Sequence, residues 1–289
     1  MSRHVTGASP NTQKEESMAK GSEVPFYQVD AFSAKTFAGN PAAVCLLDEE
    51  ISPEAMLRIA AEMNLSETAF LQRPTSDGTR KLQWFTPTVE VPLCGHATLA
   101  TAHILIRELG EEAPLRFDTL SGILTVDEEA DGWIRMDFPE DPPEEAPAPD
   151  GLLKALGIPK DAPTFRGEKL WIVRLKTEKA VKKLGPDMTA LREVDLGENA
   201  LGVSVTAPGT AGADFCSRFF GPWVGVDEDP VTGMAHTILG PYWLDELNAM
   251  ALRARQVSAR GGDLRVRRDG DRIQVSGQAV TVVKGTLRF

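Results

Sequence analysis

The chain has 289 residues, 42% of them hydrophobic and 25% charged, and carries a net charge of −11 at neutral pH. The length allows one large or two ordinary domains, each with its own core, and the acidic balance disfavours nucleic acid and anionic membranes as partners, because both bind basic surfaces. No apolar run reaches the roughly 20 residues of a membrane-spanning helix, and three cysteines fit a reducing compartment, so we expect a cytoplasmic protein.

The N-terminal part of the chain predicts a tail followed by a strand–turn–strand–helix unit. Residues 1–23 are polar and lack hydrophobic periodicity, which predicts a disordered tail. Strands are expected at 24–32 and 43–47, on either side of a Gly-Asn-Pro turn. A helix should begin at Ser52, which is followed by proline in the usual capping order, and Asn64 can end it.

Glu67 follows this helix at the point where the chain passes into an apolar strand. A carboxyl group that is partly shielded from water has a raised pKa, which suits a general acid/base that works near neutral pH. A surface glutamate at the start of a strand explains the segment 64–71 equally simply. Taken alone, these eight residues favour that simpler interpretation.

Residues 92–98 (PLCGHAT) lead into the apolar run 99–106, which has almost no polar face and therefore predicts a helix buried on all sides. Its first turn lacks a Ser, Thr, Asp or Asn cap, so its backbone N–H groups need another acceptor. Gly95 allows a ligand to approach closely, and the helix dipole favours an anion. A tight strand-to-helix turn with a hydrogen-bonded histidine remains the alternative.

A second copy of this pattern occurs at residues 229–236 (DPVTGMAH), which also enter an apolar run through a glycine. Similar hairpin sequences follow both helices, with Gly122 downstream of Gly95 and Gly262 downstream of Gly233 at nearly equal spacing. A matched glycine, helix and hairpin indicate a duplicated unit. Two such units would bring two helix N-termini to one shared cleft.

The proline- and acid-rich stretch 139–150 is the clearest boundary in the chain. It separates a predicted N-terminal lobe, residues 24–138, from a predicted C-terminal lobe, residues 151–289. Both lobes alternate strands with one central apolar helix. The sequence therefore predicts an α+β fold of two similar lobes.

Four chemistries compete for the two glycine motifs. A metal site is weakly supported, because His96 and His103 lie two helical turns apart and cannot grip one ion. Cys94 with His96 forms a possible thiol nucleophile, although buried cysteines are common at such positions. A two-thiol racemase needs a second base where this chain has Met234. The fourth option is acid/base chemistry in which Glu67 moves a proton and the helix ends hold an acidic substrate.

Five motifs in this order resemble the PhzF-like family of phenazine-biosynthesis-like isomerases, and the animal phenazine-biosynthesis-like domain proteins in particular. These motifs are residues 39–44 (GNPAAV), 64–70 (NLSETAF), 84–87 (WFTP), 92–98 (PLCGHAT) and 228–233 (EDPVTG). The resemblance extends from about residue 24 to the C-terminus.

The resemblance implies a diaminopimelate-epimerase-like fold, in which two pseudo-symmetric lobes each wrap a β-sheet round a central helix. It further implies a homodimer that needs no cofactor and no metal. Glu67 would be the catalytic acid/base, with His96 and Asp229 beside the substrate. The backbone amides of Gly95 and Gly233 would hold the substrate carboxylate together with that of Met234.

Two residues depart from what the motifs lead one to expect. The family usually has a serine after Gly233, whereas this chain has Met234, which keeps the backbone N–H but loses a hydroxyl donor worth about 1.5–3 kcal/mol to a charged group. Pro241 lies past the first turn of the second apolar helix and should kink or end it, because it cannot donate a hydrogen bond to Thr237.

We therefore expect a cytoplasmic, cofactor-independent isomerase that moves a proton on a small carboxylate-bearing metabolite. The alternative is a catalytically impaired family member that binds a ligand or a protein partner through the same cleft. Exchange of deuterium into candidate acids separates the two, since only the enzyme can introduce the label.

Overall fold

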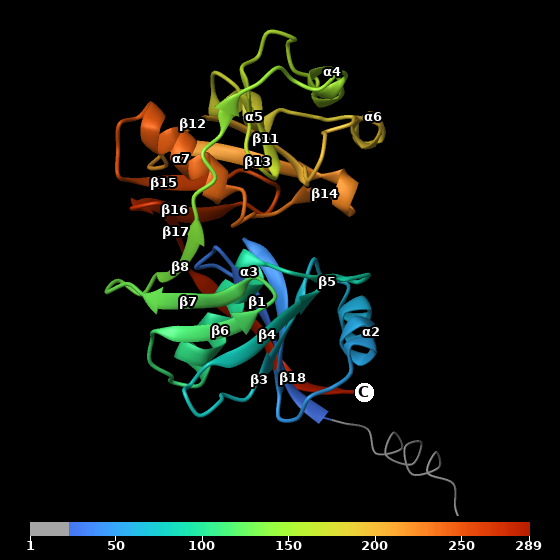
Figure 1. The fold of residues 1–289 in the computed structure, drawn as a ribbon, viewed down its shortest axis with the longest axis vertical. Helices are drawn as coiled ribbons and strands as arrows, with labels where there is room; N and C mark the ends of the chain where they lie inside the picture. Colours follow the sequence, from blue (N-terminus) through green and yellow to red (C-terminus); the bar gives the residue numbers. More distant parts are fainter. Residues whose placement is uncertain (1–22) are drawn as a thin grey trace, which may run out of the picture.

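The described part of the chain, residues 23–289, folds into two lobes, each with strands around one buried helix (Figure 1). The structure is a computed structural model. Residues 1–22 of the predicted tail lie outside the described residues, and Glu23 already belongs to the first strand. Among the residues described, no helix is long and apolar enough to cross a membrane.

The first lobe is a mixed sheet covered by one outer helix. Its elements are β1 (Glu23–Ala31), β2 (Asn40–Leu47), α2 (Pro53–Met63), β3 (Thr68–Gln72), β4 (Arg80–Phe85), β5 (Glu90–Val91), α3 (Gly95–His103), β6 (Leu115–Thr119), β7 (Gly122–Glu128) and β8 (Ile134–Pro139). Helix α2 begins and ends as predicted. Ser52 accepts a hydrogen bond from the N–H of Ala55 at 3.2 Å, and Asn64 closes the helix in the left-handed conformation.

The second lobe repeats this architecture with shorter helices at its periphery. Its elements are β9 (Glu144–Glu145), α4 (Leu152–Leu156), β10 (Thr164–Arg166), β11 (Leu170–Arg174), α5 (Glu178–Lys182), α6 (Met188–Arg192), β12 (Gly202–Pro208), β13 (Phe215–Gly221), η3 (Pro222–Val224), β14 (Val226–Asp229), α7 (His236–Glu246), β15 (Ala251–Gln256), β16 (Gly262–Asp269) and β17 (Arg272–Gly277). β13 is central and pairs with β12 on one edge and with β14 and β15 on the other.

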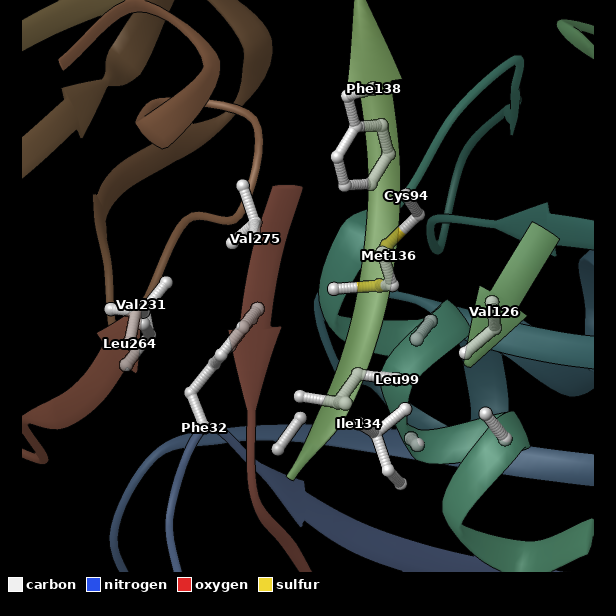
Figure 2. Packing of buried hydrophobic residues seen from close by; sticks show 14 of the residues in the cluster. Phe32, Cys94, Leu99, Val126, Ile134, Met136, Phe138, Val231, Leu264 and Val275 are labelled. Atoms are coloured by element: carbon white, nitrogen blue, oxygen red, sulfur yellow. The ribbon is translucent and has the colours of Figure 1, made fainter. Parts of the chain in front are cut away.

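Helix α3 is the centre of the first lobe, as its apolar sequence predicts. All nine of its residues are buried, and the helix continues as a π-helical turn, η2 (Ile104–Glu108). It contacts β1, β2, β3 and β8, so strands surround it on several sides. Figure 2 shows Leu99 of this helix between Ile134 and Met136 of β8 and Val126 of β7.

Helix α7 occupies the same place in the second lobe, and it does not end at Pro241. The proline leaves the carbonyl of Thr237 without its helical donor. The N–H of Asp141, from the segment that joins the lobes, donates to this carbonyl at 3.1 Å. The helix therefore continues to Glu246 because a distant residue replaces the missing hydrogen bond.

The second lobe does not extend to residue 289 as predicted. The last strand, β18 (Ala279–Arg288), returns to the first lobe and pairs antiparallel with β1, so residues 151–289 do not all belong to the second lobe (Figure 1). β18 covers the edge of β1, which would otherwise expose unpaired backbone groups. β8 and β17 also pair with each other, so hydrogen bonding continues from one lobe to the other.

The hydrophobic core also crosses between the lobes. One cluster contains Leu99 of α3 together with Val231 and Ile238 of the second lobe. Phe32 lies between Leu99 and Val231 (Figure 2). Its ring occupies the space that side chains on Gly233 and Gly277 would need, because an added Cβ would lie 3.3 Å and 2.5 Å from ring atoms. The two motif regions are thus held together by shared packing.

Candidate active site

The two glycine motifs meet at the centre of the molecule. An added Cβ on Gly95 would lie 3.4 Å from the Cα of Gly233, and one on Gly233 would lie 3.5 Å from the Cα of Gly95. Backbones approach this closely only where both residues lack side chains. The start of α3 and the turn that leads into α7 are therefore in direct contact.

The amides at this contact are free to bind a ligand. Neither helix start has a side-chain cap, and in residues 23–289 the N–H groups of Gly95, His96, Gly233 and Met234 donate to no protein acceptor. Unpaired amides and two helix dipoles concentrate positive potential at one point. Such a point can bind an anionic group without a basic side chain.

Glu67 lies in the loop between α2 and β3, and its carbonyl accepts a hydrogen bond from Ala43 of β2. Its side chain is only 18% exposed, and Oε2 lies 3.3 Å from Nε2 of His96. Burial and, to a smaller extent, the negative charge of Asp229 together raise the pKa of Glu67 to about 8, although a hydrogen bond with Cys94 opposes the shift. At neutral pH Glu67 therefore mostly holds its proton.

His96 is the buried neighbour of Glu67 on the first turn of α3. Burial lowers the pKa of its imidazole to about 3, so the ring is neutral at pH 7. Nδ1 lies 3.5 Å from the thiol of Cys94, whereas Nε2 approaches Glu67 without a well-directed hydrogen bond. Because both partners are uncharged at neutral pH, this close contact is not a salt bridge.

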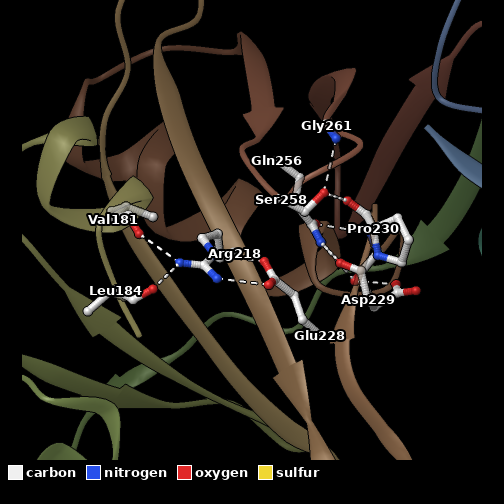
Figure 3. Close-up of polar contacts among 10 residues, drawn as sticks. Val181, Leu184, Arg218, Glu228, Asp229, Pro230, Gln256, Ser258 and Gly261 are labelled. Atoms are coloured by element: carbon white, nitrogen blue, oxygen red, sulfur yellow. Dashed lines mark hydrogen bonds and ion pairs between the residues drawn. The ribbon is translucent and has the colours of Figure 1, made fainter. Parts of the chain in front are cut away.

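Asp229 ends β14 on the other side of the contact and is held by several hydrogen bonds. Oδ1 accepts from the amide of Asn40 at 2.8 Å, and Oδ2 accepts from the hydroxyl of Thr232 at 2.5 Å. Its carbonyl accepts from Gln256, which lies beside it in Figure 3. Burial raises the pKa of Asp229 to about 6, although the hydrogen bonds from Thr232 and Asn40 oppose this shift.

The neighbouring residue Glu228 is fixed by an ion pair that keeps strand β14 in place. Arg218 donates to both of its carboxylate oxygens, at 2.7 and 2.8 Å, and also donates to the carbonyls of Val181 and Leu184 (Figure 3). This two-point contact fixes the carboxylate of Glu228 in orientation. The strand therefore presents Asp229 in one position.

The structure thus gathers the residues that the sequence singled out and adds three that it did not. Asn40, Thr232 and Gln256 carry the hydrogen bonds of Asp229. Asn40 and Thr232 occur in motifs that carry the family resemblance, but nothing in those motifs shows that the two side chains share one carboxylate. Met234 lies with its side chain half-buried against the main core cluster.

Within residues 23–289, Glu67, Cys94 and His96 form a group that could hold a metal ion, because their donor atoms lie within 4.8 Å of one another. An ion would have to displace two protons. Burial raises the pKa of the Cys94 thiol well above its ordinary value, and Glu67 is also protonated at neutral pH. A bound ion would therefore compete with these two protons for the cluster.

Comparisons with known proteins identify the family to which the chain is similar. The family model described as "Phenazine biosynthesis-like protein" matches residues 29–285. An uncharacterized isomerase of Pseudomonas aeruginosa is 48% identical over 92% of this chain and all of the relative. The mouse phenazine biosynthesis-like domain-containing protein 2 is 42% identical over 92% of this chain and 99% of the relative.

Solved structures agree with these sequence relatives. A PhzF-family crystal structure from Enterococcus faecalis superposes with a TM-score of 0.86 and 40% identity, covering 92% of this chain and 99% of that one. A hydroxyproline epimerase from Agrobacterium vitis superposes with a TM-score of 0.59 at 9% identity, covering 92% of both chains. The second likeness concerns the fold alone, and it confirms the epimerase-like architecture.

Proposed function

This chain belongs to the phenazine biosynthesis-like (PhzF) family, in which several curated relatives are named isomerases, and from this we propose that it is a cofactor-independent isomerase. Its substrate would be a small carboxylate-bearing metabolite on which the enzyme moves a proton. The observation that carries the proposal is the position of a protonated, shielded Glu67 beside the contact between two uncapped helix starts.

Glu67 is the proposed acid/base. In its carboxylate form it removes a proton from a carbon next to an activating group, and the electron pair left behind moves into that group. The same carboxylic acid then returns the proton to another carbon, so the enzyme ends as it began. With a pKa of about 8, about a tenth of the molecules carry the carboxylate at pH 7. One side chain can therefore serve both steps.

The free amides of Gly95, Gly233 and Met234 are the proposed site for the substrate carboxylate. Two helix dipoles point at this position, and an anion bound there replaces water as the acceptor of the backbone N–H groups. This contact would fix the reacting carbon relative to Glu67. Orientation of this kind contributes to catalysis even when the acid/base itself is unchanged.

His96 and Asp229 are proposed to lie beside the bound substrate. His96 is neutral at the pH values at which Glu67 titrates, so it can orient the carboxyl without adding a charge. Asp229 carries the nearby negative charge that favours the protonated form of Glu67. We also propose that the protein acts in the cytoplasm as a homodimer, which size-exclusion chromatography with light scattering would test.

The test is exchange of deuterium from D2O into a panel of small unsaturated and hydroxy acids, followed by NMR. The parent protein should introduce label into at least one acid, at a rate that rises with pH up to about 8 as Glu67 loses its proton. Glu67→Gln should lose this exchange. Glu62→Gln, an exposed glutamate on α2, is the matched control and should retain it. Equal exchange by Glu67→Gln and the parent would refute the assignment.

A further inference from the structure

The side chain of Asn40 connects the first lobe to the active-site carboxylate of the second. It is fully buried, and its amide donates to Oδ1 of Asp229 at 2.8 Å and to the carbonyl of Val231 at 2.9 Å. Its own oxygen accepts from the hydroxyl of Ser66 at 3.3 Å. Both amide hydrogens of Asn40 therefore bind acceptors of the second lobe, and the hydrogen bond from Ser66 of the first lobe fixes the orientation of the amide.

The turn before Asn40 is itself held by the second lobe. Gly39, with φ of +69°, donates to the carbonyl of Gly261 at 2.7 Å, and Arg260 donates to the carbonyl of Gly39 at 2.8 Å. Arg260 is in turn paired with the buried carboxylate of Asp30 at 2.7 Å. An added Cβ on Gly39 would lie 2.1 Å from the carbonyl oxygen of Ala31, so only glycine fits this turn. These contacts leave Asn40 little freedom to move.

We propose that Asn40 is a positioning residue of the active site, which holds the carboxylate of Asp229 in one orientation through its hydrogen bond to Oδ1. Asn40 acts through Asp229 and touches no reacting atom. The role extends the isomerisation proposed above and rests on it for its consequence in turnover. The hydrogen bonds themselves do not depend on that proposal.

The groups around Asp229 differ in which protonation state of its carboxyl they favour. Burial and the charge of Glu228 both favour the protonated form of Asp229, whereas the hydrogen bonds from Asn40 and Thr232 favour the ionised form. Asp229 in turn favours the protonated forms of Glu67 and Cys94. His96 is neutral and contributes no compensating charge. Loss of the Asn40 amide should therefore protonate Asp229 and let Glu67 ionise more easily.

The experiment compares three variants of the full chain. Asn40→Ala removes the bond from the first lobe, and Thr232→Val removes the bond to the other oxygen without touching any contact between lobes. Arg265→Ala removes ion pairs between the lobes, to Glu129 and Asp131, at a distance from Asp229, and it is the matched control. The ionisation of both carboxyl groups is followed by NMR on protein labelled with ¹³C at the carboxyl carbons of Asp and Glu, assigned with Asp229→Asn and Glu67→Gln.

The pKa of Asp229 should rise by about one pH unit in Asn40→Ala and in Thr232→Val, and that of Glu67 should fall. The pH at which deuterium exchange is half-maximal should fall with it, and Arg265→Ala should change neither value. Asn40→Leu roughly keeps the size of the side chain and removes both donors without adding a charge, so it should shift Asp229 in the same direction if Asn40→Ala does not fold.

Two results overturn the proposal. Asp229 could titrate as in the parent when Asn40 is replaced, or Arg265→Ala could shift it equally, which would reduce Asn40 to one of several contacts between the lobes. If the NMR shifts are as expected and no protein exchanges deuterium, the positioning role stands and the isomerase proposal fails. If the parent exchanges deuterium but Asp229 titrates unchanged in Asn40→Ala, the isomerase proposal stands and the positioning role fails.

Discussion

The two helix starts that meet at Gly95 and Gly233 follow one sequence pattern but are surrounded by different chemistry. At the first, Glu67 and His96 are shielded from water, lie 3.3 Å apart and lack a well-directed hydrogen bond between them. Burial has shifted the pKa of both toward the uncharged form. Groups in this state are costly to bury and ready to exchange a proton.

At the second helix start, the carboxylate and the carbonyl of Asp229 are paired in hydrogen bonds. Asp229 accepts from Asn40 and Thr232, and Gln256 binds both the carbonyl of Asp229 and the N–H of Thr232. The residue after the glycine is His96 in the first motif and the apolar Met234 in the second. In the proposed mechanism the two lobes therefore divide the chemistry: the first supplies the group that moves the proton, and the second supplies a fixed charge.

The largest test of this division is catalytic. Glu67→Gln removes the group that accepts the proton and should reduce deuterium exchange by about 10²–10⁴-fold, the usual value of a general base. Asp229→Asn keeps the shape of the fixed carboxylate but removes its charge and replaces one acceptor oxygen by an amide donor, so it should cost less than Glu67→Gln and should shift the pH dependence downward. If the two variants lost equal activity with no change in pH dependence, the lobes would not differ in the way proposed.

The next prediction concerns stability. Folded protein holds a proton on Glu67 up to about pH 8, whereas the unfolded chain releases it near its ordinary pKa of 4.5. The free energy of unfolding of the parent should therefore fall as the pH rises from 4.5 to 8, because the unfolded state releases the proton first. Glu67→Gln has no such proton, so at pH 8 it should be more stable than the parent by on the order of 4 kcal/mol.

Urea unfolding of both proteins at pH 4.5, 7 and 8 measures this difference, which should be near zero at the lowest pH. Glu62→Gln, in which the glutamate is exposed in the folded protein, should show no such trend. A constant difference between parent and Glu67→Gln at all three values would mean that Glu67 is ionised in the folded protein, contrary to its burial.

A smaller effect on stability and on anion binding should come from substitutions at the contact between Gly95 and Gly233. Gly95→Val places side-chain atoms where Gly233 packs, and overpacking of this kind costs about 1–3 kcal/mol. Sulfate or phosphate should raise the melting temperature of the parent and not that of Gly95→Val, since the free amides would be blocked. Gly95→Ala, whose Cβ would lie 3.4 Å from Gly233, should keep part of the response. A full response in Gly95→Val would place the anion elsewhere.

The elements with local signals could be predicted from the sequence. The capping residues and apolar stripe of α2 lie within one segment, and the apolar run of α3 has no polar face to expose. The matched glycine motifs also indicated that two helix starts would meet. In each case the residues that decide the structure are neighbours in the sequence, so their spacing carries the information.

The remaining features depend on partners far away in the chain. β18 returns to pair with β1, and the N–H of Asp141 donates to the carbonyl of Thr237, which Pro241 leaves without a helical donor. Neither pairing produces a local sequence pattern. Residues 64–71 alone favoured a surface position for Glu67, whereas in the fold its side chain is 18% exposed and lies beside His96. Asn40 lies in a segment that predicts a turn, whereas in the structure it begins β2, and nothing in that segment indicates the carboxylate that it binds.

Met234 gives the smallest and most specific test of the comparison, because the family resemblance leads one to expect a serine at this position. Met234→Ser should supply a hydroxyl donor beside the free amides and raise the exchange of a bound acid by up to about tenfold. The same change removes a half-buried side chain from the main core cluster, which should cost about 1–2 kcal/mol in the free energy of unfolding. Met250→Ser, at a position that is 64% exposed, is the control and should change neither quantity.

If Met234→Ser loses stability without faster exchange, the missing hydroxyl does not limit the rate of exchange in this protein. The amides alone would then suffice to hold the substrate, and the second helix start would contribute only backbone and fixed charge, which is the sharpest form of the contrast with the first.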